Sequence, residues 1–218
     1  MNILIVYAHP EPQSFNSKLK DIAQTVLKEN GNNVVVSDLY KMNFNPVAQK
    51  PDFKYLKNNN FFKYPIEQEH AYKNNILSKE IKSELSKLLW ADIIIFQFPL
   101  WWSSVPAILK GWFDKVLIYG GIYGGAYGKF KNARLSNKKA IISTTTGSSE
   151  DSFKIHGSSG DIHKQVLFHI SHGIVEYTGM QCLDTLIAYE IDKDQNSRDE
   201  YIEFFKNKIK YILSLIHI

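Results

Sequence analysis

Residues 91–113, ADIIIFQFPLWWSSVPAILKGWF, decide the fold of this 218-residue chain. After the polar Asp92, the run to Phe96 is mostly β-branched and aromatic, as in a strand buried on both faces of a parallel sheet. Apolar residues recur at helical spacing after Pro106, and proline suits the first turn of a helix. In an open α/β sheet, ligands bind beyond the carboxyl ends of central strands. The stretch therefore predicts a strand, a loop at a ligand site and a helix.

Two adjacent tryptophans lie in the loop that follows this strand. Their flat apolar faces, together with the backbone N–H groups of the loop, suit a planar ring with polar edges. The loop residues concerned are Pro99, Leu100, Trp101, Trp102, Ser103 and Ser104. Packing of the aromatic residues against the prolines is the alternative, and the loop alone does not distinguish the two.

The composition is that of an ordinary globular protein, with 44% hydrophobic and 22% charged residues. The length fits one α/β domain over residues 1–218. The net charge is +4, and the 26 basic residues are scattered among 22 acidic ones, so no nucleic-acid partner is predicted. No stretch approaches the ~20 apolar residues of a membrane span. A single cysteine, Cys182, and a first apolar run too short for a signal peptide favour a cytoplasmic location.

The start of the chain offers a candidate anion site. Residues 2–7, NILIVY, predict a strand, and apolar spacing over residues 19–27 predicts a helix. The loop between them lacks the glycines of GxGxxG and Walker sequences. It instead places His9, Ser14, Phe15 and Asn16 ahead of a helix N-terminus, where free N–H groups and the helix dipole favour a phosphate. Capping by Ser14 or Asn16 is the alternative.

A long insertion follows the second strand, which is predicted at residues 33–37. Residues 38–78 are rich in Asn and Pro and poor in periodicity, and the next clear helix covers residues 79–90. Insertions of this length tend to be functional or to cover something. The many aromatic residues argue against disorder. We expect the insertion to pack on the domain or on a second subunit.

Residues 116–130, VLIYGGIYGGAYGKF, form an unusual glycine-tyrosine segment. Glycine at this density fits neither a regular helix nor a core strand. We predict a mobile loop that carries the aromatic faces of Tyr119, Tyr123 and Tyr127. A plain surface turn is the alternative.

The fourth strand, predicted over residues 138–146, ends in small and hydroxylated residues. Backbone N–H groups at this turn could contact the carbonyl oxygens of a ring, and Gly147 permits close approach. His156 and Ser159 follow nearby. The turn residues are Thr144, Thr145, Thr146, Gly147, Ser148 and Ser149.

A helix over residues 166–173, a strand over residues 181–189 and a helix from Arg198 complete the alternation. Alternating strands and helices indicate a doubly wound α/β fold with a parallel sheet. For five strands we predict the flavodoxin-like order 2-1-3-4-5, which brings the loops after strands one, three and four to one edge.

Metal and nucleophile chemistry are not predicted. His163, His169 and His172 lie at offsets that do not share one helix face, and no cysteine or carboxylate supports them at zinc spacing. No GxSxG sequence indicates a hydrolase triad.

Four segments carry a family resemblance: AHPEPQSFNS, SDLYKMNFNPVAQKPD, FQFPLWWSSVPAILKGWFDKV and STTTGSS. Together they resemble the FAD-dependent NAD(P)H quinone oxidoreductases of the flavodoxin-like superfamily, over residues 3 to about 210. The resemblance implies non-covalent FAD, with FMN as the lesser candidate, and NAD(P)H as cosubstrate. It also implies a homodimer, and two-electron hydride transfer through flavin N5 to a quinone by a ping-pong mechanism.

The resemblance also implies roles for individual residues. The matching FAD positions are His9, Ser14, Phe15, Asn16, Ser17, Pro99, Leu100, Trp101, Trp102, Ser103, Thr145, Thr146, Gly147 and Ser148. Arg198 would reach the adenine end, and Lys63 stands where the family usually has a glutamine from the second subunit. The nicotinamide or quinone would face Trp102, Tyr123, Tyr127 and Phe153.

The chain departs from the family where charge is stabilised during hydride transfer. Phe153 and Ser159 stand where the family has a tyrosine and a histidine, and His156, three residues from each, is the candidate substitute. The backbone N–H near Gly147 would supply part of the stabilisation. Two alternatives stay open: a flavin-binding regulatory subunit, as in potassium efflux systems, and an FMN-dependent azo- or nitroreductase.

Overall fold

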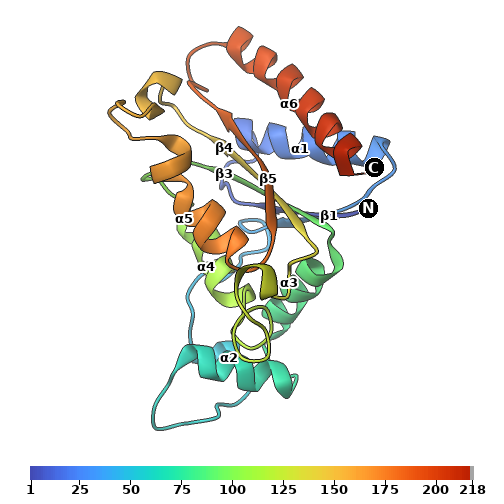
Figure 1. Cartoon of the computed structure of the whole chain (residues 1–218), viewed down its shortest axis with the longest axis vertical. Coiled ribbons are helices and arrows are strands. Elements are labelled where there is room, and N and C mark those ends of the chain that lie inside the picture. The colour runs from blue at the N-terminus through green and yellow to red at the C-terminus, as the bar shows by residue number, and fades with distance from the viewer. Residues whose placement is uncertain (217–218) are drawn as a thin grey trace.

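The computed structural model describes residues 1–216, and these form a five-stranded, wholly parallel sheet. The strand order is β2-β1-β3-β4-β5, so the predicted order is confirmed (Figure 1). The strands are β1 (Asn2–Tyr7), β2 (Asn33–Asp38), β3 (Ile93–Pro99), β4 (Lys139–Thr145) and β5 (Gln181–Ala188).

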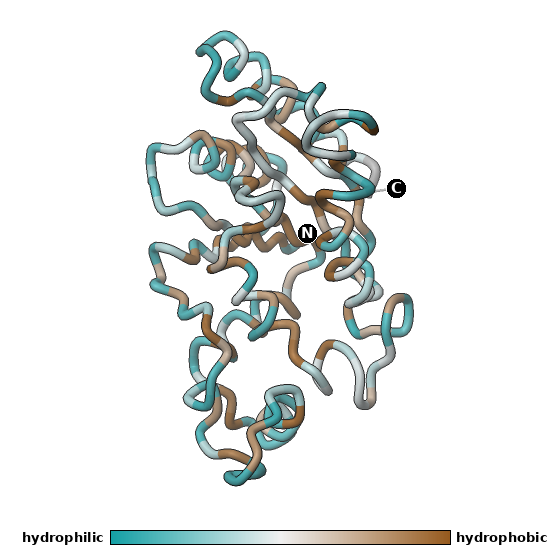
Figure 2. Tube along the Cα trace, turned by 90° about the vertical axis from the view of Figure 1, so that its left-hand side faces the viewer, coloured by the Kyte–Doolittle hydropathy of each residue, from teal (hydrophilic) through white to brown (hydrophobic). Residues whose placement is uncertain are grey.

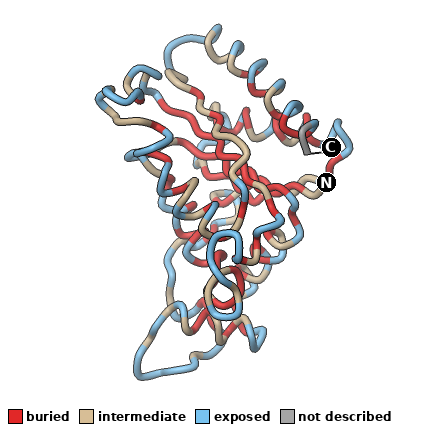
Figure 3. The backbone as a smooth tube through the Cα atoms, viewed as in Figure 1, coloured by how far each residue is buried: buried red, intermediate tan, exposed pale blue. Residues whose placement is uncertain are grey.

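Helices cover both faces of the sheet. Side chains of α1 (Phe15–Glu29) and α6 (Gln195–Ile216) pack with Ile93 and Ile95 on one face. Those of α3 (Lys79–Trp90) and α4 (Ala107–Val116) pack with the alternate residues of β3 on the other. Every residue of β3 is therefore buried, as its continuous apolar run predicts (Figure 3). Figure 2 shows the hydrophobic runs of the chain gathered in the strands and their covering elements.

The insertion contains a helix that the sequence did not reveal, α2 (Tyr64–Lys73). Its buried residues include Glu67 and Gln68, so it lacks the apolar stripe that makes a helix visible in a sequence. Figure 1 places α2 at one end of the molecule and α6 at the other.

The helix predicted over residues 166–173 extends beyond these residues in both directions and is mostly a π-helix. It consists of π-helical turns over Ile162–Val166 and Ser171–Glu176 on either side of the short α5 (Phe168–Ile170). The last helix begins at Gln195, three residues before Arg198, because Asp194 accepts a hydrogen bond from the N–H of Ser197 at 2.8 Å. Short 3₁₀ turns cover Lys50–Asp52, Phe130–Asn132 and Glu150–Phe153.

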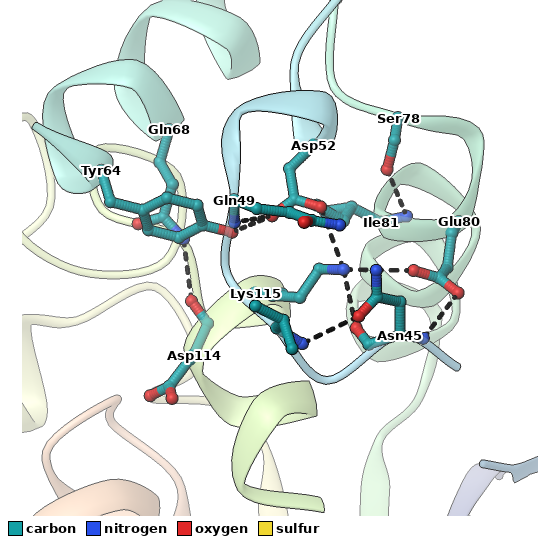
Figure 4. A network of polar contacts seen from close by, with 11 residues as sticks. Asn45, Gln49, Asp52, Tyr64, Gln68, Ser78, Glu80, Ile81, Asp114 and Lys115 are labelled. Atoms are coloured by element: carbon teal, nitrogen blue, oxygen red, sulfur yellow. Dashed lines mark hydrogen bonds and ion pairs between the residues drawn. The ribbon is translucent and has the colours of Figure 1, made fainter. Parts of the chain in front are cut away.

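A buried ion pair fastens the insertion to the domain (Figure 4). Lys115 of α4 is 1% exposed, and its Nζ lies 3.0 Å from Asp52 Oδ1 and 3.3 Å from Glu80 Oε2. The same ammonium donates to the carbonyl of Asn45 at 2.7 Å, and Tyr64 donates its hydroxyl to Asp52 at 2.8 Å. Burial and this bond to Asp52 raise the pKa of Tyr64. The insertion thus packs on α3 and α4 of its own domain, which confirms one of the two positions that we expected for it.

Gly111 lets the insertion cross α4 in direct contact. A Cβ at this position would lie 2.3 Å from the carbonyl oxygen of Pro46 and 2.4 Å from its Cα. These atoms are backbone, so they cannot rotate away as a side chain could. The contact requires glycine.

No helix among residues 1–216 combines the length and the apolarity needed to cross a membrane.

Candidate active site

The loops after β1, β3 and β4 meet at the carboxyl edge of the sheet, as predicted (Figure 1). The N–H of Ala8 donates to the carbonyl of Gln97 at 3.0 Å, which joins the first loop to β3. The N–H of Leu100 donates to the carbonyl of Thr145 at 2.8 Å, which joins the tryptophan loop to β4. The three loops therefore begin from one rigid edge.

A buried chain of side-chain hydrogen bonds lies beneath this edge. Gln97 donates through Nε2 to Asn16 Oδ1 at 2.7 Å, and Asn16 donates through Nδ2 to Thr145 Oγ1 at 2.6 Å. All three residues are buried. The chain links β3, α1 and β4, the elements that carry the candidate loops.

Helix α1 begins at the first loop. Ser14 is its N-cap, because its hydroxyl accepts the N–H of Ser17 at 3.1 Å. The N–H groups of Phe15 and Asn16 lie in the first turn, where a helix provides no acceptor of its own. Capping is thus confirmed for Ser14, whereas the side chain of Asn16 serves the buried chain instead. Two donors remain for an anion at the end of a 15-residue helix.

The tryptophan loop is a tight turn with left-handed residues. Trp101 and Ser104 exchange both backbone hydrogen bonds at 3.0 Å, and the two residues between them have φ of +51° and +54°. This is the geometry of a type I′ turn, which normally favours glycine or asparagine. Non-glycine residues held there concentrate at functional sites.

Trp102 is fully exposed, so it does not pack against the prolines as the alternative supposed. Trp101 lies with its ring 6.0 Å from that of His9, which brings the loops after β1 and β3 together. Both tryptophans line a cavity of about 490 Å³ with Tyr40, Lys110 and His169. The turn thus presents a flat apolar face beside a cavity at the sheet edge.

The glycine-tyrosine segment folds into successive turns, with Gly120, Gly124 and Gly125 at positive φ. Tyr123 lies edge-on to Tyr177 at 5.5 Å and lines a cavity of about 440 Å³. This cavity shares Lys110 and Ile174 with the tryptophan cavity. Burial raises the pKa of Tyr123, so its phenol remains a hydrogen-bond donor at neutral pH. The ring of Tyr127 instead lies under the guanidinium of Arg134, 5.2 Å away.

The loop after β4 divides its candidate residues between two places. Gly147 lies at the sheet edge, where the neighbouring N–H of Thr146 donates to the carbonyl of Ala188 at 2.8 Å. Phe153 is buried with its ring 6.0 Å from that of Tyr189. His156 is exposed and lines a separate cavity of about 670 Å³ with these two rings. Within one chain, His156 and Trp102 therefore line different cavities.

The two basic candidates also lie apart. Arg198 donates through Nε to the carbonyl of Ile191, and its guanidinium lies 3.8 Å from Asp192. A Cβ at Gly147 would lie 3.5 Å from Asp192, so Arg198 belongs to the same edge as the loop after β4. Lys63 is exposed and directly precedes α2 at the far end of the molecule (Figure 1).

Comparison with known proteins places the chain in a family. The model of the flavodoxin-like fold family matches residues 1–211. NAD(P)H dehydrogenase [quinone] 1 from Rattus norvegicus is 41% identical over 211 residues, which cover 96% of this chain and 76% of the relative. This chain belongs to the flavodoxin-like NAD(P)H dehydrogenase (quinone) family.

Two further proteins support the family assignment. Ribosyldihydronicotinamide dehydrogenase [quinone] from Mus musculus is 40% identical over 212 residues, covering 96% of this chain and 91% of the relative. A crystal structure from Klebsiella pneumoniae, described as that of a quinone reductase, superposes with a TM-score of 0.91 at 35% identity. It covers 96% of this chain and 84% of its own.

The structure places two further residues at the site, His169 and Tyr177, which the sequence did not assign to it. His169 Nε2 lies 2.9 Å from Ser104 Oγ and so holds the tryptophan turn to α5. Tyr177 lines the cavity of Tyr123. In the sequence, His169 drew notice only as one of three clustered histidines, and nothing marked Tyr177. Among the described residues, no three His, Cys, Asp or Glu side chains are grouped as metal ligands.

His9 is expected to lower the stability of the folded protein in acid. Its pKa is lowered from 6.5, chiefly by burial and against the opposing effect of Glu11. As the pH falls through about 6.5, the unfolded chain takes up a proton before the folded chain does, so stability falls. Chemical denaturation at about pH 7 and about pH 5 should show a smaller loss in His9→Gln than in the parent protein. Equal losses would contradict a neutral His9 in the folded state.

Proposed function

We propose that the chain is an NAD(P)H:quinone oxidoreductase with non-covalent FAD. The observation that carries the proposal is the meeting of three loops at one sheet edge, which combines free helix N–H groups with an exposed indole. Phosphates bind at helix N-termini, and planar rings bind apolar faces. When bound, FAD would accept a hydride from NAD(P)H and deliver two electrons to a quinone that next occupies the same place.

The residues present fit such a cofactor. The N–H groups of Phe15 and Asn16 lie in the first turn of α1, where the helix provides no acceptor, and such donors suit a diphosphate. We assign the diphosphate and ribityl chain to His9, Ser14, Phe15, Asn16 and Ser17. The ring would lie against Pro99, Leu100, Trp101, Trp102 and Ser103, with Thr145, Thr146, Gly147 and Ser148 along its polar edge. Arg198 at the same edge supports FAD over FMN, since a planar guanidinium can stack on an adenine ring.

The substrate side is assigned to Trp102, Tyr123, Tyr127 and Phe153. Tyr123 offers a protonated phenol beside the tryptophan cavity, and Trp102 offers a stacking face that excludes water from one side of the ring. The backbone N–H of Gly147, with His156 and Ser159 on the same loop, would stabilise negative charge that develops on the ring.

We further propose that the enzyme is a homodimer of the cytoplasm. Lys63 is exposed on the insertion, where it is free to contact a second subunit. Single-cysteine usage supports a reducing compartment. Sedimentation velocity should give twice the mass of the 25.1 kDa chain. A monomer that is fully active would remove the role assigned to Lys63.

The His156 role has its own test. His156→Ala is expected to lower kcat about tenfold, the lower end of the effect of losing one hydrogen bond to a charged group, because this side chain is exposed. Ser158→Ala is the matched control on the same loop and should retain the parent rate. The assay is steady-state NAD(P)H oxidation with a quinone at saturating substrate. A parent-like rate for His156→Ala would show that this histidine does not replace the missing tyrosine and histidine.

The cofactor and the enzyme class are tested together. Flavin released by heat from the purified protein should elute as FAD on chromatography, and the holoprotein should oxidise NAD(P)H with repeated turnover of quinone. FMN would favour the azoreductase alternative. Bound FAD without turnover would favour a regulatory subunit.

A further inference from the structure

The glycine-tyrosine segment needs support from outside to hold one conformation. Residues 119–128 contain five glycines, and glycine loses more backbone freedom on ordering than any other residue. Tyr123 lies within this segment, is half-buried, and lines the cavity of about 440 Å³. The position of its phenol therefore depends on the contacts that hold the segment.

The side chain of Arg134 contacts the segment on both sides of Tyr123. Its Nη1 donates to the carbonyl of Gly121 at 3.0 Å, before Tyr123 in the chain. Its guanidinium carbon lies 5.2 Å from the centre of the Tyr127 ring, which follows Tyr123. The backbone N–H of Arg134 also donates to the carbonyl of the buried Ile122 at 3.0 Å. One residue thus holds both flanks of the turn that carries Tyr123.

The same guanidinium joins the segment to helix α2 of the insertion. It donates through Nη1 to the hydroxyl of Tyr72 and lies 5.7 Å from the centre of that ring. Gln68, one turn earlier on α2, accepts the N–H of Tyr119 at 3.2 Å and donates to the carbonyl of Asp114 at 2.9 Å. Because residues four apart share one face of a helix, Gln68 and Tyr72 form a common surface for the segment.

We propose that Arg134 is a positioning residue for quinone reduction: by holding the turn on both sides of Tyr123, it keeps the Tyr123 phenol in the cavity as a hydrogen-bond donor to a carbonyl oxygen of the quinone. The inference rests on the proposed function, because it needs a quinone in this cavity. The rings of Tyr119 and Tyr177 lie edge-on to Tyr123 at 5.8 Å and 5.5 Å, so they orient the ring, whereas Arg134 fixes the backbone.

A through-space effect of the Arg134 charge is the alternative, and two variants separate it from positioning. Arg134→Lys keeps the charge, but an ammonium lacks the planar guanidinium that bonds to two oxygens while it stacks on rings. It should therefore behave like Arg134→Met. Lys131 is exposed on the neighbouring 3₁₀ turn, so Lys131→Met is the control that removes a nearby charge.

The test is a double-mutant cycle on the KM for menadione, measured with the holoprotein at saturating NADH. Arg134→Met and Tyr123→Phe are each expected to raise this KM about fivefold, the effect of losing one hydrogen bond, with kcat within about twofold of the parent value. The double variant should be no weaker than either single one, because both changes remove the same donor. Lys131→Met should keep the parent KM.

Amide hydrogen exchange of the purified protein gives a second readout, which does not depend on the reaction. Arg134→Met should speed exchange over residues 119–128, where backbone bonds such as that from the Tyr127 N–H to the Gly124 carbonyl at 2.8 Å lose their support. Exchange in this segment should be unchanged in Lys131→Met.

The outcomes separate the inference from the proposed function. A parent-like KM in Arg134→Met or Arg134→Lys, losses that multiply to about 25-fold in the double variant, or unchanged exchange would overturn the role of Arg134. If Arg134→Met does not fold, Arg134→Lys carries the test alone. A parent protein that reduces no menadione would overturn the proposed function, and hydrogen exchange would then decide whether Arg134 holds the segment.

Discussion

Lys115→Met is expected to lower the free energy of unfolding by about 3–5 kcal/mol. The side chain is buried, and its ammonium bridges Asp52, Glu80 and the carbonyl of Asn45. Removing it leaves the buried carboxylate of Asp52 without its counter-charge, which is the costly way to break a buried ion pair. Because these contacts join the insertion to α3 and α4, we also expect the insertion to become sensitive to protease.

Lys110→Met on the same helix is the control. Its ion pair with Asp114 is formed at 2.7 Å between side chains that are 57% and 47% exposed, so we expect a change below about 1 kcal/mol. Urea denaturation followed by far-UV circular dichroism measures both variants. Equal, small effects at the two lysines would contradict the view that this ion pair fastens the insertion.

Gly111→Ala is expected to destabilise the fold by about 3 kcal/mol or to prevent folding. The added Cβ would overlap backbone atoms of Pro46 at 2.3–2.4 Å, so either the insertion or α4 must move. Gly173→Ala is the control, because no atom lies within 4 Å of a Cβ there. Thermal unfolding should show a large fall in Tm for Gly111→Ala and little change for Gly173→Ala. A parent-like Tm in Gly111→Ala would contradict the contact.

The sheet could be predicted because its signal is local. Strands such as β3 are buried on both faces, so they form continuous apolar runs that stand out in the sequence. Their order followed from the alternation of strands and helices. The helix α2 was missed because its buried face is polar: Glu67 accepts the N–H groups of Lys57 and Asn58, which no periodicity reveals.

The candidate site could be predicted only in part. Residues in the loops after strands, such as Ser14 and Trp102, could be found because the fold class places the carboxyl ends of the parallel strands at one edge of the sheet. The hydrogen-bond chain was not found, since Gln97 and Thr145 meet through Asn16 across more than a hundred positions of sequence. The left-handed turn at Trp102 and the contact of His169 with Ser104 are likewise tertiary features, which spacing along the chain does not encode.

The most direct test of the account follows the flavin spectrum of the purified protein under anaerobic conditions, with NADH added first and menadione second. We predict that NADH bleaches the flavin band and that menadione restores it, so that the two half-reactions occur in turn. A protein that shows no flavin band and cannot be reconstituted with FAD would contradict the account.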